Sequence, residues 1–564
     1  MSEVIAHNTI MEPYKETVSV KTTTGPIRGY IYKEDGKTYC KFKKIPYAKP
    51  PLGPLRFKPP SPITKWTEEL DCTLDAPMPI QRNHKGEIFG AEDCLYIELS
   101  TKTLTPSKLL PVMFWIGTYM YSVNIDNFLD PTLLNDSGVL FVRCGFRLGP
   151  FGFLSINEFT APGNCGLKDI VMALKWVQNN IEKFGGDPNN VTIFGSSTGG
   201  SITHLMMLSP MAAGLFHKAI IQSSSAFNNW SLTKNPYISV IELAKRLSIT
   251  KSHQVEIVEE LRTLPAEDIV AVASDLQAEI MPHATTNIFD SYFKPCIEVD
   301  HEGLQAFLTK SPWSILKSGN FNRVPLIIGS NSIEGSVFQF ITKDFYSDFE
   351  KYNEDIRNIV PKHLLCDVKL SKEIGKKLLM FYFGENTTLC EKSKLQYIQL
   401  ISDYYFLYFV NKTVRLHCEM VPECPVFYYV VNCAGKWSVP EDLCFLSNLG
   451  HSTELTFIFR IIDRNSSIPK NGTPDSFTTR NRVIRMWTNF AKFGNPTPDK
   501  HDELLQIQWQ PVENKEKLNY LNIDTQLTMG INPFHERMKF WDNLHKEYSL
   551  VRMLAHFNDM GVSW

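Results

Sequence analysis

The chain has 564 residues, of which 43% are hydrophobic, 12% aromatic and 21% charged. This composition is typical of a globular protein with ample material for a core, and it excludes extensive disorder away from the chain ends. The formal net charge of -2 gives no basic excess. We therefore expect neither nucleic acid nor an anionic membrane surface to be a partner.

The N-terminal residues Met1 to Asn8 carry an acid early and lack an apolar core of roughly 7 to 15 residues. We therefore expect no secretory signal and a cytoplasmic location. Apolar stretches such as 109–113 and 324–328 fall far short of the roughly 18 residues of a membrane span. The twelve cysteines include no C-x-x-C pair and no Cys/His cluster at zinc spacing, so we expect no metal site.

The first half of the chain opens with short β segments. After a flexible segment, 1–17, alternation predicts a strand at 18–22, and further strands follow at 28–32 and 39–42. The runs 111–116 and 139–143 are almost continuously apolar, which is typical of strands buried on both faces. These runs predict a large central sheet that is mostly parallel.

Helices alternate with the later strands. Apolar residues at three- and four-residue steps predict a helix over 167–184, and buried strands are expected at 219–222 and 324–329. The mostly helical stretches 237–307 and 345–417 are interpreted as insertions that cap the sheet. A strand at 426–431 and helices at 478–493 and 533–548 complete one α/β domain over 18–548, followed by a tail, 549–564.

One stretch carries a chemical motif. Four β-favouring residues, Val191 to Phe194, run into a G-x-S-x-G pentapeptide centred on Ser197, and helix-compatible spacing follows from Ser201. This strand, turn and helix are the context of a nucleophile elbow, which exposes the hydroxyl of a serine on a strained turn. By itself the pattern is equally compatible with a Ser/Gly-rich loop.

A serine nucleophile needs a base, and the base needs an orienting carboxylate. In α/β-hydrolases the chain order is serine, acid, histidine. Glu334 follows a predicted buried strand, and His451 lies in the last loop before the C-terminal helices. The alternatives are a solvated loop acid and a surface histidine. His204 lies roughly 10 Å along the same helix as Ser197 and is a poor candidate for the base.

Several further motifs stand in register along the chain. They are Ile45–Ala48 with Pro51–Phe57, Glu92–Tyr96, Arg147–Gly149 with Gly152–Ser155, Pro162–Asn164, Gly166–Asp169, Phe184–Pro188, and Trp487–Ala491 with Gly494–Pro496. On these motifs the chain resembles the type-B carboxylesterases, the family of cholinesterases and carboxylesterases, over about 18–548. It is most similar to the intracellular α-esterases of insects.

The resemblance implies an α/β-hydrolase fold with helices on both faces of the sheet. It places the nucleophile on Ser197, the acid on Glu334 and the base on His451, with no cofactor. Cys72 and Cys94 match a pair that is disulfide-linked in secreted relatives, and a reducing compartment leaves that bond in question. The oligomeric state stays open.

Two departures from the family pattern concern the oxyanion site. Ser196 and Thr198 replace the Glu and Ala that usually flank the nucleophile, and the loop 117–121 reads G-T-Y-M-Y where relatives have H-G-G-G-F. Tyr and Met adopt the backbone geometry of glycine less readily, and one lost oxyanion donor costs about 10²–10³ in turnover. We assign Thr198, Thr118 and Tyr119 to this site, with a hydroxyl of Tyr119 or Tyr121 as an alternative donor.

The sequence therefore predicts a serine carboxylesterase that cleaves an apolar ester through an acyl-enzyme, with turnover reduced by the atypical loop. The alternative is a catalytically silent protein of the same fold that binds or sequesters hydrophobic esters, or that engages a protein partner.

Overall fold

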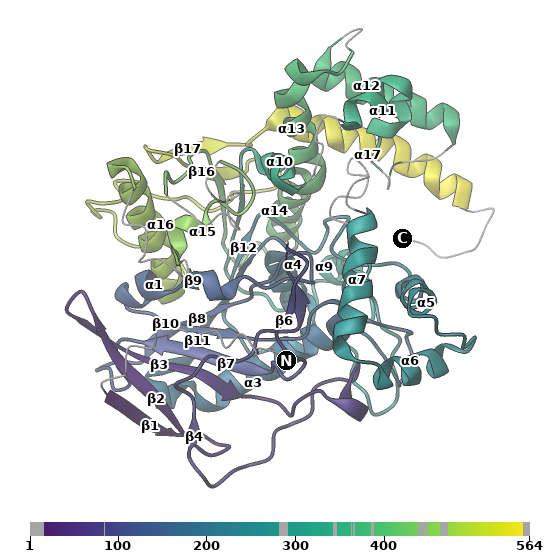
Figure 1. Cartoon of the computed structure of the whole chain (residues 1–564). Helices are drawn as coiled ribbons and strands as arrows, with labels where there is room; N and C mark the ends of the chain where they lie inside the picture. The colour runs from purple at the N-terminus through teal and green to yellow at the C-terminus, as the bar shows by residue number, and fades with distance from the viewer. Residues whose placement is uncertain are drawn as a thin grey trace.

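A 13-stranded sheet runs through the centre of the computed structural model (Figure 1). The structure describes residues 16–83, 85–280, 291–341, 347–361, 364, 367–384, 388–437, 446, 449–462 and 472–556. The strands are β1 (Glu16–Lys21), β2 (Pro26–Glu34), β3 (Lys37–Pro46), β4 (Leu70–Asp71), β7 (Tyr96–Thr101), β8 (Leu110–Trp115), β10 (Leu140–Cys144), β11 (Gly186–Ser196), β12 (Lys218–Gln222), β13 (Leu326–Asn331), β14 (Val426–Val431), β16 (Asn519–Ile523) and β17 (Thr528–Ile531).

The strand order is β1-β2-β3-β7-β10-β8-β11-β12-β13-β14-β16-β17, with β4 beside β2. Pairing is parallel from β10 through β16 and antiparallel at both ends of the sheet. Two small ribbons pair β5 (Gln81–Arg82) with β6 (Ile88–Phe89) and β9 (Leu129–Asp130) with β15 (Arg460–Ile461). This is the α/β-hydrolase arrangement that the sequence predicts.

Both faces of the sheet are covered, and β8 shows why its sequence is continuously apolar. Successive side chains of a strand point to opposite faces. Val112 and Phe114 pack into one hydrophobic cluster, and Met113 and Trp115 pack into a second. Helices α3 (Cys165–Asn180) and α4 (Thr198–Leu208) cover the first face, and α16 (Pro474–Phe493) covers the second.

The predicted helical insertions surround this core. Helices α5 (Pro236–Arg246), α6 (Gln254–Thr263) and α7 (Ala266–Ile280) gather on one side in Figure 1. At the top of the view lie α11 (Ser347–Glu354), α12 (Val368–Phe383), α13 (Lys394–Ser402) and the last helix, α17 (His535–His556). The other α-helices within the described residues are α1 (Thr132–Asp136), α2 (Gly149–Phe153), α9 (Pro312–Ser318), α10 (Phe338–Ile341), α14 (Tyr408–Met420) and α15 (Leu455–Ile458).

Strands β7, β16 and β17 have no predicted counterpart, and several predicted elements differ from the observed ones at their ends. The helix predicted over 167–184 is α3 followed by a 3₁₀ turn, Ile181–Phe184. Helix α16 begins earlier than predicted because the Thr473 hydroxyl caps it, accepting from the Ser476 amide at 3.3 Å. Helix α17 continues to His556, past the predicted end at 548. Within the described ranges, none of the helices is long and apolar enough to span a membrane.

Candidate active site

Ser197 occupies a sharp turn between β11 and α4. Its backbone has φ 57° and ψ -129°, a conformation that ordinarily requires glycine. The turn is crowded, because a Cβ on Gly199 would lie 2.1 Å from the Ile116 carbonyl oxygen. Two bonds fix the turn, since the Ser197 amide donates to the Gln222 carbonyl at 2.9 Å and the Ser224 hydroxyl donates to the Ser197 carbonyl at 2.6 Å. The local structure is that of a nucleophile elbow.

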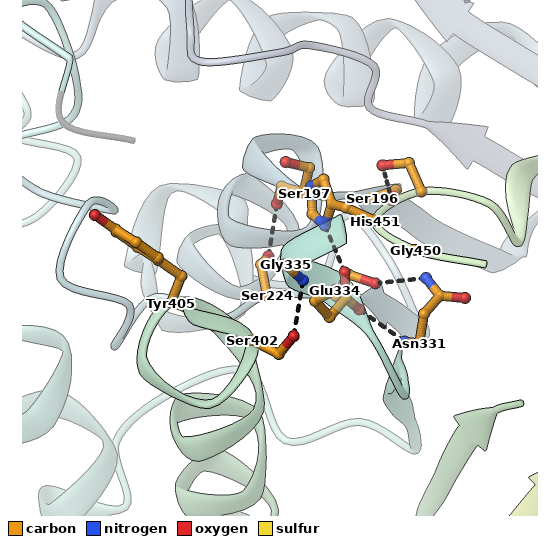
Figure 2. Close-up of polar contacts among 12 residues, drawn as sticks. Ser196, Ser197, Ser224, Asn331, Glu334, Gly335, Ser402, Tyr405, Gly450 and His451 are labelled. Atoms are coloured by element: carbon orange, nitrogen blue, oxygen red, sulfur yellow. Dashed lines mark hydrogen bonds and ion pairs between the residues drawn. The ribbon is translucent and has the colours of Figure 1, made fainter. Parts of the chain in front are cut away.

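Glu334 and His451 meet beside this elbow. Glu334 opens a 3₁₀ turn, Glu334–Val337, after β13. Its Oε1 accepts from the Asn331 amide at 2.7 Å, and its Oε2 lies 2.6 Å from His451 Nδ1. Both side chains are buried, so Glu334 is not a solvated loop acid and His451 is not a surface residue. Figure 2 shows the His451 ring between Ser197 and Glu334.

A second buried carboxylate, Glu454, lies beside the same site, against the residues that precede Ser197 and Glu334. Its Oε1 accepts from the Ser196 hydroxyl at 3.0 Å and from the Gln222 amide at 3.1 Å, and its Oε2 accepts from the Asn331 side chain at 2.6 Å. Burial, with the nearby charge of Glu334, raises the pKa of Glu454. Sequence reasoning missed this residue, because nothing in the local sequence distinguishes it from a solvated loop acid.

His204 belongs to a separate pair of histidines. Its Nδ1 accepts from the Ala226 amide at 3.0 Å, and its Nε2 lies 3.0 Å from Nε2 of His417. Burial lowers the pKa of both rings, that of His417 to about 4. Both ring nitrogens of His204 are engaged away from Ser197, as its position on the helix predicted.

In the loop after β8, the polar groups of Thr118 and Tyr119 form hydrogen bonds within the loop itself. The Tyr119 amide donates to the Val123 carbonyl at 2.6 Å, and the Thr118 hydroxyl donates to the same oxygen at 3.2 Å. The Thr198 hydroxyl donates to the Thr118 carbonyl at 2.7 Å, which ties the loop to the elbow. In this conformation the Tyr119 amide is already bonded and does not face an incoming oxyanion.

Met120 and Tyr121 adopt φ values of 50° and 58°, a region that side chains other than glycine disfavour. Tertiary contacts impose this conformation. The Tyr121 carbonyl accepts from the Gly149 amide at 2.7 Å, and its hydroxyl lies 3.2 Å from both the Ser201 hydroxyl and the Ser231 carbonyl. The Tyr121 hydroxyl is therefore held between Ser201 of α4 and the loop that follows β12.

The Tyr119 hydroxyl lies on the side of the loop that faces the histidine loop. Burial raises the pKa of the Tyr119 phenol, and the nearby side chain of Ser452, the residue after His451, acts in the opposite direction. Tyr119 therefore belongs to the polar surroundings of Glu454 and His451.

Cys72 and Cys94 are both buried and both free thiols in the structure. The Cys72 thiol donates to the Lys44 carbonyl at 3.2 Å, and burial raises its pKa to about 12. The disulfide that the resemblance implied is not formed here.

Residues 16–541 match the family model described as "Carboxylesterase family". The chain belongs to the carboxylesterase family. It is 31% identical over 554 residues to venom carboxylesterase-6 of Apis mellifera, a match that covers 94% of this chain and 95% of that protein. It is 30% identical to juvenile hormone esterase of Tribolium castaneum, covering 96% of this chain and 95% of that protein.

Among solved structures, this carboxylesterase chain is similar to juvenile hormone esterase from Manduca sexta with OTFP covalently attached. The TM-score is 0.80 at 28% identity, and the match covers 94% of this chain and 100% of the other. The predicted family and the predicted fold are thus confirmed.

Proposed function

We propose that this carboxylesterase family member hydrolyses carboxylic esters through an acyl-enzyme formed on Ser197. The observation that carries the proposal is the 2.6 Å contact between Glu334 and His451 beside a serine on a strained elbow. Serine is a weak nucleophile until a base takes its proton, and the base needs an acceptor that fixes its tautomer. These are the functions that the three side chains can supply.

In the proposed reaction the Ser197 oxygen attacks the carbonyl carbon of the ester while His451 Nε2 accepts the hydroxyl proton. Glu334 accepts the hydrogen bond from His451 Nδ1 and stabilises the imidazolium that forms. His451 then protonates the departing alcohol, leaving an acyl group on Ser197. A water molecule then attacks the acyl carbonyl carbon while His451 Nε2 accepts its proton. His451 returns that proton to the Ser197 oxygen as the carboxylic acid leaves, which restores the free enzyme.

The oxyanion site is where we propose that rate is lost. Thr198 is the first residue of α4, and the amides of a first helical turn have no acceptor within their own helix. We assign the Thr198 amide as a donor to the oxyanion. The amide of Tyr119 is held by Val123, so its help requires a change in the loop. One missing donor costs about 10²–10³ in turnover.

An apolar substrate group fits the surroundings of His451. The Phe406 ring lies tilted against the imidazole, with the ring centroids 4.4 Å apart, and the centroid of the Trp230 ring is 6.2 Å from that of Phe406. We propose that the acyl or alcohol part of the ester is hydrophobic.

The test uses a short-chain aryl ester and an organophosphate. We expect Ser197 to be phosphorylated, seen as one added phosphoryl group by mass spectrometry, while ester turnover is slow. Ser197→Ala should abolish labelling, whereas the matched variant Ser201→Ala, one turn further along α4, should still be labelled. If the protein is neither labelled nor active, the proposal fails and the silent ester-binding alternative replaces it.

A further inference from the structure

A π-helical turn, Asp403–Leu407, interrupts the long helix formed by α13 and α14. All five of its residues are buried. Such turns are rare, and they occur frequently at functional sites because the wider turn releases backbone groups from the regular helical ladder. The contacts of this turn show what the interruption does.

On the inner side, Ser402, directly before the turn, contacts the loop of the acid, and Phe406 of the turn contacts the base. The Gly335 amide, next to Glu334, donates to the Ser402 hydroxyl at 2.8 Å (Figure 2). Phe406 lies against His451, with ring centroids 4.4 Å apart and planes at 35°. One segment of helix therefore contacts the neighbour of the acid and the ring of the base.

The backbone of the turn is also held from a third side. The Tyr405 carbonyl accepts hydrogen bonds from the Trp230 indole at 3.1 Å and from the Asn228 side chain. Both donors lie in the loop that follows β12. These bonds give the Tyr405 carbonyl two donors at the point where the regular helical hydrogen bonding is interrupted, and they tie the turn to the loop after β12.

On its outer side the turn is anchored by Asp403. The Tyr382 hydroxyl of α12 donates to Asp403 Oδ2 at 2.6 Å, and the Trp541 indole of α17 donates to the Tyr382 oxygen at 2.8 Å. Arg537 of α17 lies 3.5 Å from Asp403 Oδ1. Burial raises the pKa of Asp403 to about 6, against the opposing effects of Arg537 and Tyr382.

Burying a carboxylate carries a large desolvation penalty, and packed apolar residues can stabilise a helix–helix contact at least as well. Asp403 and Arg537 instead fix the angular position of one helical turn relative to α17. Phe406, three residues after Asp403, lies against the ring of the base. The position of Asp403 in this turn therefore favours a role in orienting the catalytic groups rather than a role only in stabilising the fold.

We propose that the turn Asp403–Leu407 is a positioning element of the active site, in which Asp403 and Phe406 let the docked C-terminal helix α17 fix the orientation of His451. This inference rests on the proposed function, because it needs His451 to be the base. Asp403 and Phe406 act through His451 and are positioning residues.

The test compares activity per titrated active site. The organophosphate counts the competent serines, and kcat is then expressed per labelled Ser197. We expect Asp403→Asn to lower this kcat by about tenfold with KM within about twofold, since small misplacements of a catalytic group have effects of this size. Phe406→Leu should lower it similarly, and Tyr382→Phe by about threefold.

The matched control is Glu547→Gln. Glu547 of α17 pairs with Lys377 of α12 at 2.6 Å, so it joins the same two helices through an exposed ion pair. Its loss should leave kcat per site unchanged. The inference is overturned if Asp403→Asn and Tyr382→Phe lower the number of titrated sites while kcat per site stays at the wild-type value. If wild-type protein is not labelled at all, the proposed function fails instead.

Stability supplies a second readout that separates positioning from cohesion. Because the pKa of Asp403 is raised to about 6, its ionisation destabilises the native state, and this cost grows as pH rises from about 4 through about 6. Asparagine does not titrate. The melting temperature of Asp403→Asn relative to wild type should therefore rise between about pH 5 and pH 7.5, while activity per site stays low. The proposal would be contradicted if Asp403→Asn had a lower melting temperature and fewer titrated sites than wild type at both pH values while its kcat per site stayed normal.

Discussion

Glu334→Gln is expected to lower kcat by about 10⁴-fold while leaving the fold intact. The reason lies in the two partners of the carboxylate. Oε1 accepts from the Asn331 backbone amide, which can only donate, and Oε2 accepts from His451 Nδ1. A glutamine must keep its oxygen toward Asn331, so its NH₂ group faces His451. Nδ1 then becomes the acceptor, the proton moves to Nε2, and the ring can no longer take the proton of Ser197.

The measurement is kcat for an aryl ester beside a thermal melt. Glu334→Asp is the matched control, because it keeps two acceptor oxygens and changes only their reach, and it should lose less activity. A Glu334→Gln protein with near wild-type kcat would show that Glu334 does not set the tautomer of His451, and the assignment of the acid would have to be withdrawn.

Replacing Thr118, Tyr119 and Met120 together by glycine is expected to raise kcat by about 10²-fold, the value of one recovered oxyanion donor. Met120 has a φ of 50°, and the Tyr119 amide is held by Val123. Glycine accepts positive φ without strain and removes the Thr118 hydroxyl that bonds to the Val123 carbonyl, so the amides can turn toward Ser197 more readily.

The matched control for the loop is the triple alanine variant. Alanine also removes the large side chains but disfavours positive φ, so it should show little or no gain. Burst kinetics with the aryl ester would separate acylation from deacylation, and both steps should accelerate because both pass through an oxyanion. No gain from glycine would mean that the loop does not limit turnover.

The sequence was sufficient to predict the central parallel strands and to select Ser197, Glu334 and His451 as candidates, because those signals are local or follow chain order. Val112 to Trp115 are apolar at every position, which only a strand covered on both faces requires. Ser197 is marked by its strand, turn and helix, and Glu334 and His451 by their order along the chain and their positions in loops.

What the sequence could not give depends on tertiary contacts. Met120 and Tyr121 have unfavourable propensities for positive φ, yet the buried contacts of Tyr121 impose it. Glu454 gains its significance only when Asn331 and Ser196 are brought to it. The π-helical turn at Asp403 is not marked in the sequence, because four of its five buried residues are aromatic or aliphatic and fit an ordinary apolar helix face.

The backbone conformation of Ser197 bears on the stability of the native state. A residue with a side chain at φ 57° and ψ -129° costs the native state about 1–3 kcal/mol, a sizeable part of the roughly 5–15 kcal/mol that keeps a domain folded. Glycine at this position would relieve that cost in one step. Under the proposed function, retaining the Ser197 hydroxyl therefore carries a standing cost in the stability of the native state.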